Sequence, residues 1–300
     1  MNKNLSRWLL FTVLCIIWGS SFKMMKDSGT ALLASQIAAL RIFAAGLVFV
    51  PLAIFHIRHV PRKKIGVVIL SAVFGNLLPA FFFAAAMQKI DGSLGGILNA
   101  LTPISVVITG ISLFGIKTER RKIIGVLIGF SGLILLTLSP VITGEKSISF
   151  DNAAYILLAM AGTLLYGINI NMVGKYMKDV HPIHAATVSL AFMTIPTLLV
   201  LWQQNFFSLD FSNHAVRGAI GWIVLLGVLG SAIATALFYA LVRNAGGLFA
   251  SLVTYGIPFV ALGWGLYDHE VISWLRILCL LIILLGVYLA NRTVKKSGNV

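Results

Sequence analysis

The chain has 300 residues, of which 59% are hydrophobic and only 11% are charged, and its mean hydropathy is +0.96. This composition excludes an ordinary water-soluble protein, whose surface needs more charged side chains. The formal net charge of +14 would suit nucleic-acid binding, but the basic residues gather in short joints between apolar stretches. Such joints are typical of loops at the inner face of a membrane, so we expect a lipid bilayer as the partner and no nucleic acid.

Ten stretches are long and apolar enough to cross the hydrocarbon core, for which a helix needs about 20 residues. In chain order they are predicted at residues 8–26, 34–57, 65–86, 93–115, 122–140, 152–173, 183–203, 217–241, 247–267 and 272–291. The longest joint between them is only 203–216, so no separate soluble domain is expected. Most of the 23 basic residues lie in joints on the side of the N-terminus. The positive-inside rule therefore places both termini in the cytoplasm.

The first two spans each contain a basic residue. Lys23, in the stretch WGSSFKMMK, lies near the end of its span and four residues before Asp27, so both share one helix face. We interpret it as an interfacial ion pair, with a cation at the mouth of a cavity as the alternative. Arg41 lies deeper, about seven residues into the second span, and needs a partner. We interpret it as a structural clamp held by helix-end carbonyls or an acid, with direct contact to a substrate carboxylate as the alternative.

The second half of the sequence repeats the first. At an offset of 155 residues, GNLLPAFFFAA from Gly75 aligns with GSAIATALFYA from Gly230, and Pro103 aligns with Pro258. Each half, 1–145 and 146–300, then contains five spans, and an odd number gives the halves opposite orientations. We therefore expect two inverted five-helix repeats in one membrane domain. Such repeats build alternating-access transporters whose site lies near the midplane.

The paired prolines lie about ten residues into spans four and nine, where a proline removes a backbone hydrogen bond and kinks the helix. Kinks at equivalent places of two halves indicate a substrate cavity, although packing kinks without a role in transport are the alternative. We assign Arg41, Pro103 and Pro258 structural or gating roles. The predicted substrate-binding residues are polar or aromatic and lie on the central spans, although each is equally well explained by ordinary packing. They are Trp18, Ser21, Lys23, Asn76, Phe83, Asn99, Thr102, Tyr166, Asn169, Tyr239, Tyr255 and Trp264.

Spans five and ten are interpreted as scaffold. Gly125 and Gly129 of span five have the small-xxx-small spacing that favours close helix approach, and span ten is almost unbroken Leu and Ile. The pairs His56 with His59 and His181 with His184 have a spacing that can bind metal, but no third type of ligand stands beside either, so no metal site is expected. No nucleophile is flanked by a base and no phosphate-binding glycine loop occurs, so no catalytic residue, enzymatic activity or cofactor is expected.

Several stretches together resemble the drug/metabolite transporter superfamily, specifically the ten-helix EamA-type permeases and exporters. They are IIWGSSFKMMK at 16–26, AALRIF at 38–43, LTPIS at 101–105, GVLIGFSGL at 125–133, HEVIS at 269–273 and GVYLAN at 286–291. The resemblance implies ten helices in two inverted halves, a central cavity lined by both, and export or exchange of small metabolites, often amino acids. Glu270 matches a glutamate that the family often has before span ten, whereas Glu119 lies a few residues late for the equivalent place before span five.

The sequence thus predicts an all-α integral membrane protein of a bacterial-type cytoplasmic membrane that moves a small-molecule substrate. Amino acids are the favoured substrates, and a monomer or weak homodimer is expected. All nine acids fall in joints or at span ends, so we expect facilitated diffusion or exchange rather than proton coupling. Two alternatives stay open. One is an organic-cation or drug transporter with an aromatic cage, and the other is a membrane scaffold or receptor that transports nothing.

Overall fold

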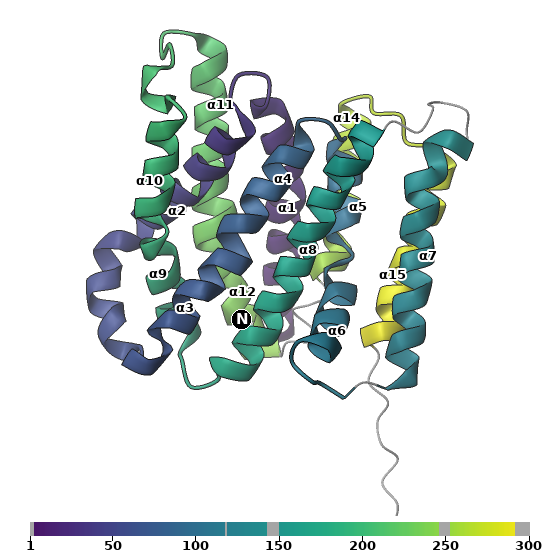
Figure 1. The fold of residues 1–300 in the computed structure, drawn as a ribbon, viewed down its shortest axis with the longest axis horizontal. Coiled ribbons are helices and arrows are strands. Elements are labelled where there is room, and N and C mark those ends of the chain that lie inside the picture. Colours follow the sequence, from purple (N-terminus) through teal and green to yellow (C-terminus); the bar gives the residue numbers. More distant parts are fainter. Residues whose placement is uncertain (1–2, 118, 143–149, 246–252, 292–300) are drawn as a thin grey trace, which may run out of the picture.

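The computed structural model of the chain describes residues 3–117, 119–142, 150–245 and 253–291, which form helices joined by turns and short loops and contain no strand. Most helices run roughly along one direction, so the loops gather at two ends of a bundle (Figure 1). The end that carries Asp268 and Glu270 is called the Glu270 end, and the end that carries His56 and His184 is called the His184 end. The predicted all-α class is confirmed.

The elements alternate long apolar helices with short turns. In chain order they are α1 (Lys3–Ser28), α2 (Ala34–His56), η1 (Ile57–His59), η2 (Arg62–Lys64), α3 (Ile65–Ala72), η3 (Val73–Leu77), α4 (Leu78–Met87), α5 (Gly92–Asn99), α6 (Thr102–Ser112), α7 (Arg120–Ile142), α8 (Phe150–Tyr176), α9 (Pro182–Phe192), α10 (Thr194–Gln203), η4 (Phe206–Ser208), α11 (His214–Leu225), η5 (Leu226–Ile233), α12 (Ala234–Ala245), α14 (Val253–Tyr267) and α15 (Trp274–Asn291).

Seven helical segments of the described chain are long and apolar enough to cross a membrane. They coincide with predicted spans one to four and six to eight, at Arg7–Ser28, Ala34–His59, Arg62–Met87, Gly92–Ser112, Ala153–Tyr176, Pro182–Gln203 and His214–Phe238. Shorter apolar helices lie where spans five, nine and ten are predicted, at Ile123–Leu136, Val253–Tyr267 and Trp274–Leu289. Each of these three borders residues that fall wholly or partly outside the described part. The chain is an integral multi-pass membrane protein, whereas ten crossings in two inverted repeats stay a prediction.

Helices α7 and α15 lie side by side at one edge of the bundle (Figure 1). A Cβ atom at Gly286 of α15 would lie 2.6 Å from the carbonyl oxygen of Gly125 and would also meet the backbone of Gly129. Only glycine permits so close an approach. The predicted close packing at Gly125 and Gly129 is therefore confirmed.

The predicted halves share one core. Helix α1 packs against α14, α8 packs against α5 and α6, and α2 packs against α9. The main cluster of buried apolar side chains includes Leu14, Ile97 and Ile257, which lie on both sides of the predicted boundary at residue 145. Residues of the two halves are thus held against one another in the centre of the bundle.

Two central helical stretches contain π-helical turns at equivalent places. Helix α3 passes through η3 into α4, and α11 passes through η5 into α12. The aligned glycines, Gly75 and Gly230, lie in these two turns. A π-helical turn changes the backbone hydrogen-bond pattern and often marks a functional site.

The helix of span four is interrupted just before Pro103, at the place where the sequence predicts a proline kink. Helix α5 ends at Asn99 and α6 begins at Thr102, so Pro103 lies in the first turn of α6, where its missing N–H costs nothing. The ring of a proline clashes with the carbonyl four residues earlier, which is that of Asn99, so the helix stops there. The Asn99 carbonyl instead accepts from Oγ1 of Thr102 at 2.7 Å. Pro258 lies inside α14, as expected.

Candidate functional site

Trp18 and Phe238 form an aromatic contact between α1 and α12. Their ring centroids lie 5.4 Å apart, and the indole N–H of Trp18 donates to the carbonyl oxygen of Gly230 at 2.8 Å. Gly230 belongs to η5, where the π-helical turn interrupts the regular ladder and leaves a carbonyl available to a side chain. The helix irregularity thus orients a predicted substrate-binding residue.

Phe83 and Tyr166 form a second aromatic contact, between α4 and α8. Their rings stack with centroids 6.1 Å apart and planes at 21°, and Phe22 packs edge-on against Phe83 at 5.7 Å. Phe83 is buried, whereas Trp18 and Tyr166 are half-buried. Both contacts join the predicted halves, and aromatic walls of this kind suit a partly apolar molecule.

Arg41 of α2 lies against the same π-helical turn. Its Nε donates to Oγ of Ser231 at 3.0 Å, and its Nη1 lies 3.8 Å from Sδ of Met25. None of the described carboxylates forms an ion pair with it. The partners are therefore a hydroxyl and a thioether, not the helix-end carbonyl or acid that the sequence suggests. The close approach depends on Gly227, where a Cβ atom would collide with the carbonyl oxygen of Arg41.

Two of the three predicted asparagines, Asn76 and Asn169, lie at the other π-helical turn, η3. Ser71, just before it, donates its hydroxyl to Oδ1 of Asn169 at 2.8 Å. Gly75 faces the same amide, since a Cβ atom there would lie 2.8 Å from Cγ of Asn169. The half-buried amide of Asn76 has no hydrogen bond to the described part of the chain. Both π-helical turns thus carry polar groups of the candidate site.

Other predicted site residues have local, structural contacts within or beside their own helices. Ser21 is buried and donates to the carbonyl oxygen of Trp18 at 2.6 Å. Asn99 and Thr102 are buried around the break between α5 and α6. For these three, the packing interpretation fits the geometry better. Tyr255 is half-buried on α14, and the side chain of Tyr239 lies outside the described part.

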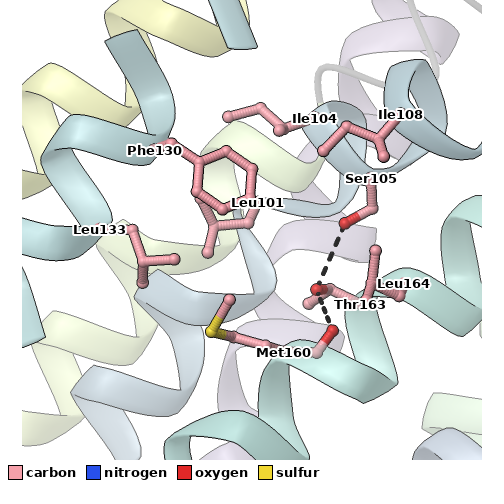
Figure 2. Close-up of a pocket in the computed structure, with 9 residues that line it drawn as sticks. All are labelled: Leu101, Ile104, Ser105, Ile108, Phe130, Leu133, Met160, Thr163 and Leu164. Carbon is pink, nitrogen blue, oxygen red and sulfur yellow. Dashed lines mark hydrogen bonds between the residues drawn. The ribbon is translucent and has the colours of Figure 1, made fainter. Parts of the chain in front are cut away.

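A small cavity lies beside α6, α7 and α8 (Figure 2), with a volume of about 40 Å³. Its walls are mostly apolar, and its polar side chains already form hydrogen bonds with other residues of the chain. Ser105 donates to Oγ1 of Thr163 at 3.4 Å, and Thr163 donates to the carbonyl oxygen of Met160 at 2.7 Å. One water molecule takes about 30 Å³ in the liquid, so this cavity is too small for a metabolite. A larger, open hollow of about 530 Å³ lies among the loops of the Glu270 end, bordered by Gln36, Gln88 and Gln204.

Lys23 ties α1 to the loop that follows α14, at the Glu270 end. Its Nζ lies 3.0 Å from Oδ2 of Asp27, which confirms the predicted pair, and 2.6 Å from Oδ1 of Asp268. It also lies 5.6 Å from the ring centroid of Trp264, whose indole N–H donates to Ser20 at 2.8 Å. Lys23 is thus already engaged by two carboxylates and an aromatic ring.

A second set of charges surrounds Asp91, just before α5. Lys26 lies 3.0 Å and Arg276 lies 3.3 Å from its carboxylate oxygens. Burial raises the pKa of Asp91, but the hydrogen bonds and charges of Lys26 and Arg276 outweigh it, so the pKa lies below its ordinary value. Glu270 accepts from the backbone N–H of Gly92 at 3.0 Å, which places an anion at the N-terminus of α5. These contacts join α1, α5 and α15 at this end.

Asn171 makes the corresponding tie toward the His184 end. At an offset of 148 residues it aligns with Lys23, and its Nδ2 donates to the carbonyl oxygen of Val106 at 2.8 Å and to Oγ1 of Thr109 at 2.9 Å. Lys23 thus joins α1 to the end of α14, and Asn171 joins α8 to α6. The first contact is charged and the second is neutral.

The two histidine pairs meet at the His184 end. The Nδ1 atoms of His184 and His56 lie 2.8 Å apart, His59 stacks on His184 at 4.7 Å, and the ring of His181 lies 5.3 Å from that of His184. Sequence spacing showed each pair but not their contact, which depends on the packing of α2 against α9. Within the described residues, no three histidine, cysteine or acidic side chains are placed to hold a metal ion.

Sequence reasoning missed several residues of these contacts, among them Ser231, Phe238, Met25 and Asp268. Ser231 and Phe238 lie in the repeat segment around Gly230, so that alignment could have found them. Met25 and Asp268 carry no such signal, because their partners are set by how α1 rotates against η5 and α14.

The comparisons with known proteins agree with this architecture. A family model described as the EamA-like transporter family matches residues 6–138 and again residues 153–292. A WAT1-related chloroplastic protein of Arabidopsis thaliana is 23% identical over 95% of this chain and 69% of its own length. The uncharacterized inner membrane transporter YedA of Escherichia coli is 24% identical over 92% of this chain and 90% of its own.

A solved crystal structure shares the fold. It aligns with a TM-score of 0.62 over 95% of this chain and 96% of its own, at 18% identity, and this likeness concerns the fold alone. The two family matches together cover most of the sequence. The chain therefore belongs to the EamA-like transporter family, within the drug/metabolite transporter superfamily, and is a membrane transporter.

Proposed function

We propose that the protein moves small, partly apolar metabolites, with amino acids as the favoured substrates, across a bacterial-type cytoplasmic membrane. The observation that carries the proposal is the meeting of aromatic and polar side chains from both predicted halves in the centre of the bundle. Trp18 meets Phe238 there, and Phe83 meets Tyr166. Sites at the interface of two repeats are characteristic of secondary transporters.

The ties at the two ends support alternating access as the mechanism. The charged contacts of Lys23 close the Glu270 end, and the contacts of Asn171 join helices toward the other end. Alternating access requires the ties at one end to break while those at the other hold. Ion pairs between partly exposed side chains are weak enough to break in each cycle, at about 0–1 kcal/mol each.

The described carboxylates favour facilitated diffusion or exchange over proton coupling. Those of Asp27, Asp91, Asp268 and Glu270 lie at the Glu270 end, and those of Glu119, Asp179 and Asp210 lie in other joints. A proton-coupled carrier usually has an ionisable group inside the membrane whose protonation is linked to substrate binding. We therefore expect substrate to equilibrate without an imposed pH gradient.

Counterflow into proteoliposomes tests the proposal. Vesicles loaded with unlabelled L-phenylalanine or L-leucine should take up the labelled amino acid faster than protein-free vesicles. A Tyr166→Ala variant should lose most of this uptake, and Trp222→Ala, on the exposed face of α11, serves as the control. Uptake of labelled quaternary amines alone would instead support the organic-cation alternative, which the aromatic side chains also suit. No counterflow of any probe would favour a scaffold or receptor.

A further inference from the structure

Arg41 is a charged group inside a membrane span whose charge has no counter-ion in the described chain. A guanidinium carries five N–H donors. Its Nε is bonded to Ser231, and its Nη1 has only the sulfur of Met25, which is a weak acceptor. Its Nη2 has no hydrogen-bond partner among the described residues.

Unpaired arginines are rare inside membranes. They almost always pair with an acid or a carbonyl, or line a space that water and ligands can reach. The basic residues Lys23, Lys26 and Arg276 at the Glu270 end all have described carboxylates as partners. Arg41 differs from them, yet it is half-buried and not fully enclosed. Nη2 is not among the buried polar atoms that lack a partner, so this group borders accessible space.

The donors that Arg41 leaves unused match a carboxylate. Ser231 occupies the Nε edge, so the edge formed by Nη1 and Nη2 remains, and this fork can bind two carboxylate oxygens with parallel hydrogen bonds. Trp18 is bonded to Gly230, the neighbour of Ser231, and its ring contacts Phe238. The guanidinium and this aromatic contact thus meet the same π-helical turn, η5.

We propose that Arg41 binds the carboxylate of the transported substrate, while the aromatic side chains of Trp18, Phe83 and Tyr166 contact its apolar part. This inference rests on the proposed transport function and narrows its substrate class. The substrates are small molecules that carry a free carboxylate and an apolar or aromatic body, as apolar amino acids do. Organic cations without a carboxylate are disfavoured, because Arg41 repels them.

A thermal-shift comparison of acids with their amides tests this site without any need for transport. Cys15 and Cys279 are buried and free, so a thiol-reactive fluorescent dye reports unfolding of the detergent-solubilised protein. L-phenylalanine and L-leucine should raise the melting temperature of the wild type, whereas L-phenylalaninamide and L-leucinamide should not. Equal shifts by acids and amides, or no shift by either acid, would overturn the proposal.

Arg41→Gln should abolish the difference between acid and amide. Because Arg41 has no counter-ion to lose among the described residues, this variant should melt at or above the wild-type temperature without ligand. The matched control is Arg276→Gln, which breaks the contact with Asp91, lowers the melting temperature and keeps the preference for acids. A large loss of stability in Arg41→Gln with an unchanged acid preference would identify a structural clamp and refute the proposal. If Arg41→Gln fails to fold, the comparison of acids with amides in the wild-type protein still tests whether the site binds a carboxylate.

Counterflow measurements separate this inference from the proposed function. Acid-selective thermal shifts without counterflow would refute transport and leave the carboxylate site in place. Counterflow that treats L-phenylalanine and L-phenylalaninamide alike would support transport and refute the site.

Discussion

The ammonium of Lys23 lies 2.6 Å from the carboxylate of Asp268, although 245 positions separate them in the sequence. The contact joins α1 to the loop after α14 at the Glu270 end. Asp27, four residues after Lys23, accepts from the same ammonium at 3.0 Å. One ammonium is thus shared by two carboxylates at this end.

Asp268→Asn should make the Glu270 end open more often. A partly exposed ion pair contributes about 0.2–1 kcal/mol, so its loss should increase the open population by about 1.4- to 5-fold. The measurement is the labelling rate of a cysteine introduced at Ser20, next to Trp264, by a membrane-impermeant maleimide. Asp210→Asn, whose carboxylate contacts only its own loop, is the control and should leave the rate unchanged. Equal rates in both variants would contradict a gating role for Asp268.

Trp18→Phe should lower stability while keeping an aromatic ring beside Phe238. The substitution removes the hydrogen bond from Trp18 to Gly230, and interhelical hydrogen bonds in membranes contribute about 0.6 kcal/mol on average, up to about 1.7. The melting temperature, followed by dye labelling of the buried cysteines, should fall by a few degrees. Trp222→Phe on an exposed part of α11 is the matched control. Equal melting temperatures of the two variants would show that the hydrogen bond from Trp18 to Gly230 does not contribute to stability.

Gly227→Ala should impair folding and transport, because a Cβ atom there would collide with the backbone oxygen of Arg41. Moving α2 away from η5 would also break the bond between Arg41 and Ser231. Gly221→Ala, where a Cβ atom meets nothing within 4 Å, should be neutral or slightly stabilising, since alanine is the better helix former. Expression, melting temperature and counterflow of the two variants check this contrast. Wild-type expression, melting temperature and counterflow of Gly227→Ala would show that α2 can move away from η5 without loss of stability or transport.

Asp91 should make stability depend on pH in the acidic range. Its folded-state pKa lies below the ordinary value because Lys26 and Arg276 outweigh the effect of burial. A lowered pKa gives stability that is present above the unfolded-state pKa, about 3.9, and is lost as the pH falls through the folded-state value. Asp91→Asn should therefore lower the melting temperature near neutral pH.

The difference between wild type and Asp91→Asn should shrink as the pH falls below about 4. The side chain of Asp91 is 40% exposed, so the effect at neutral pH should be about 1 kcal/mol or less. Glu119→Gln, in a joint, is the control and should show no such trend. A difference that stays constant with pH would show that the charge of Asp91 does not stabilise the fold.

Much of the architecture can be predicted from the sequence because it depends on local properties. Length and hydropathy alone mark the seven spans that the described residues show, and the alignment of Gly75 with Gly230 predicts two equivalent places that the structure shows as π-helical turns. The pair of Lys23 with Asp27 follows from a spacing of four residues on one helix. The aromatic residues Trp18, Phe83 and Tyr166 could be singled out because each lies on a central span where the two halves of the sequence align.

The contacts between distant segments depend on the tertiary structure. Whether Lys23 meets Asp268, Arg41 meets Ser231, or His56 meets His184 is decided by the rotation of each helix about its axis and by how closely its neighbours pack. Pro103 and Pro258 align in the sequence, but Pro103 follows a break between two helices, whereas Pro258 lies inside α14. Sequence spacing determines which face of a helix carries a residue, but only the packing of the whole bundle decides what that face meets.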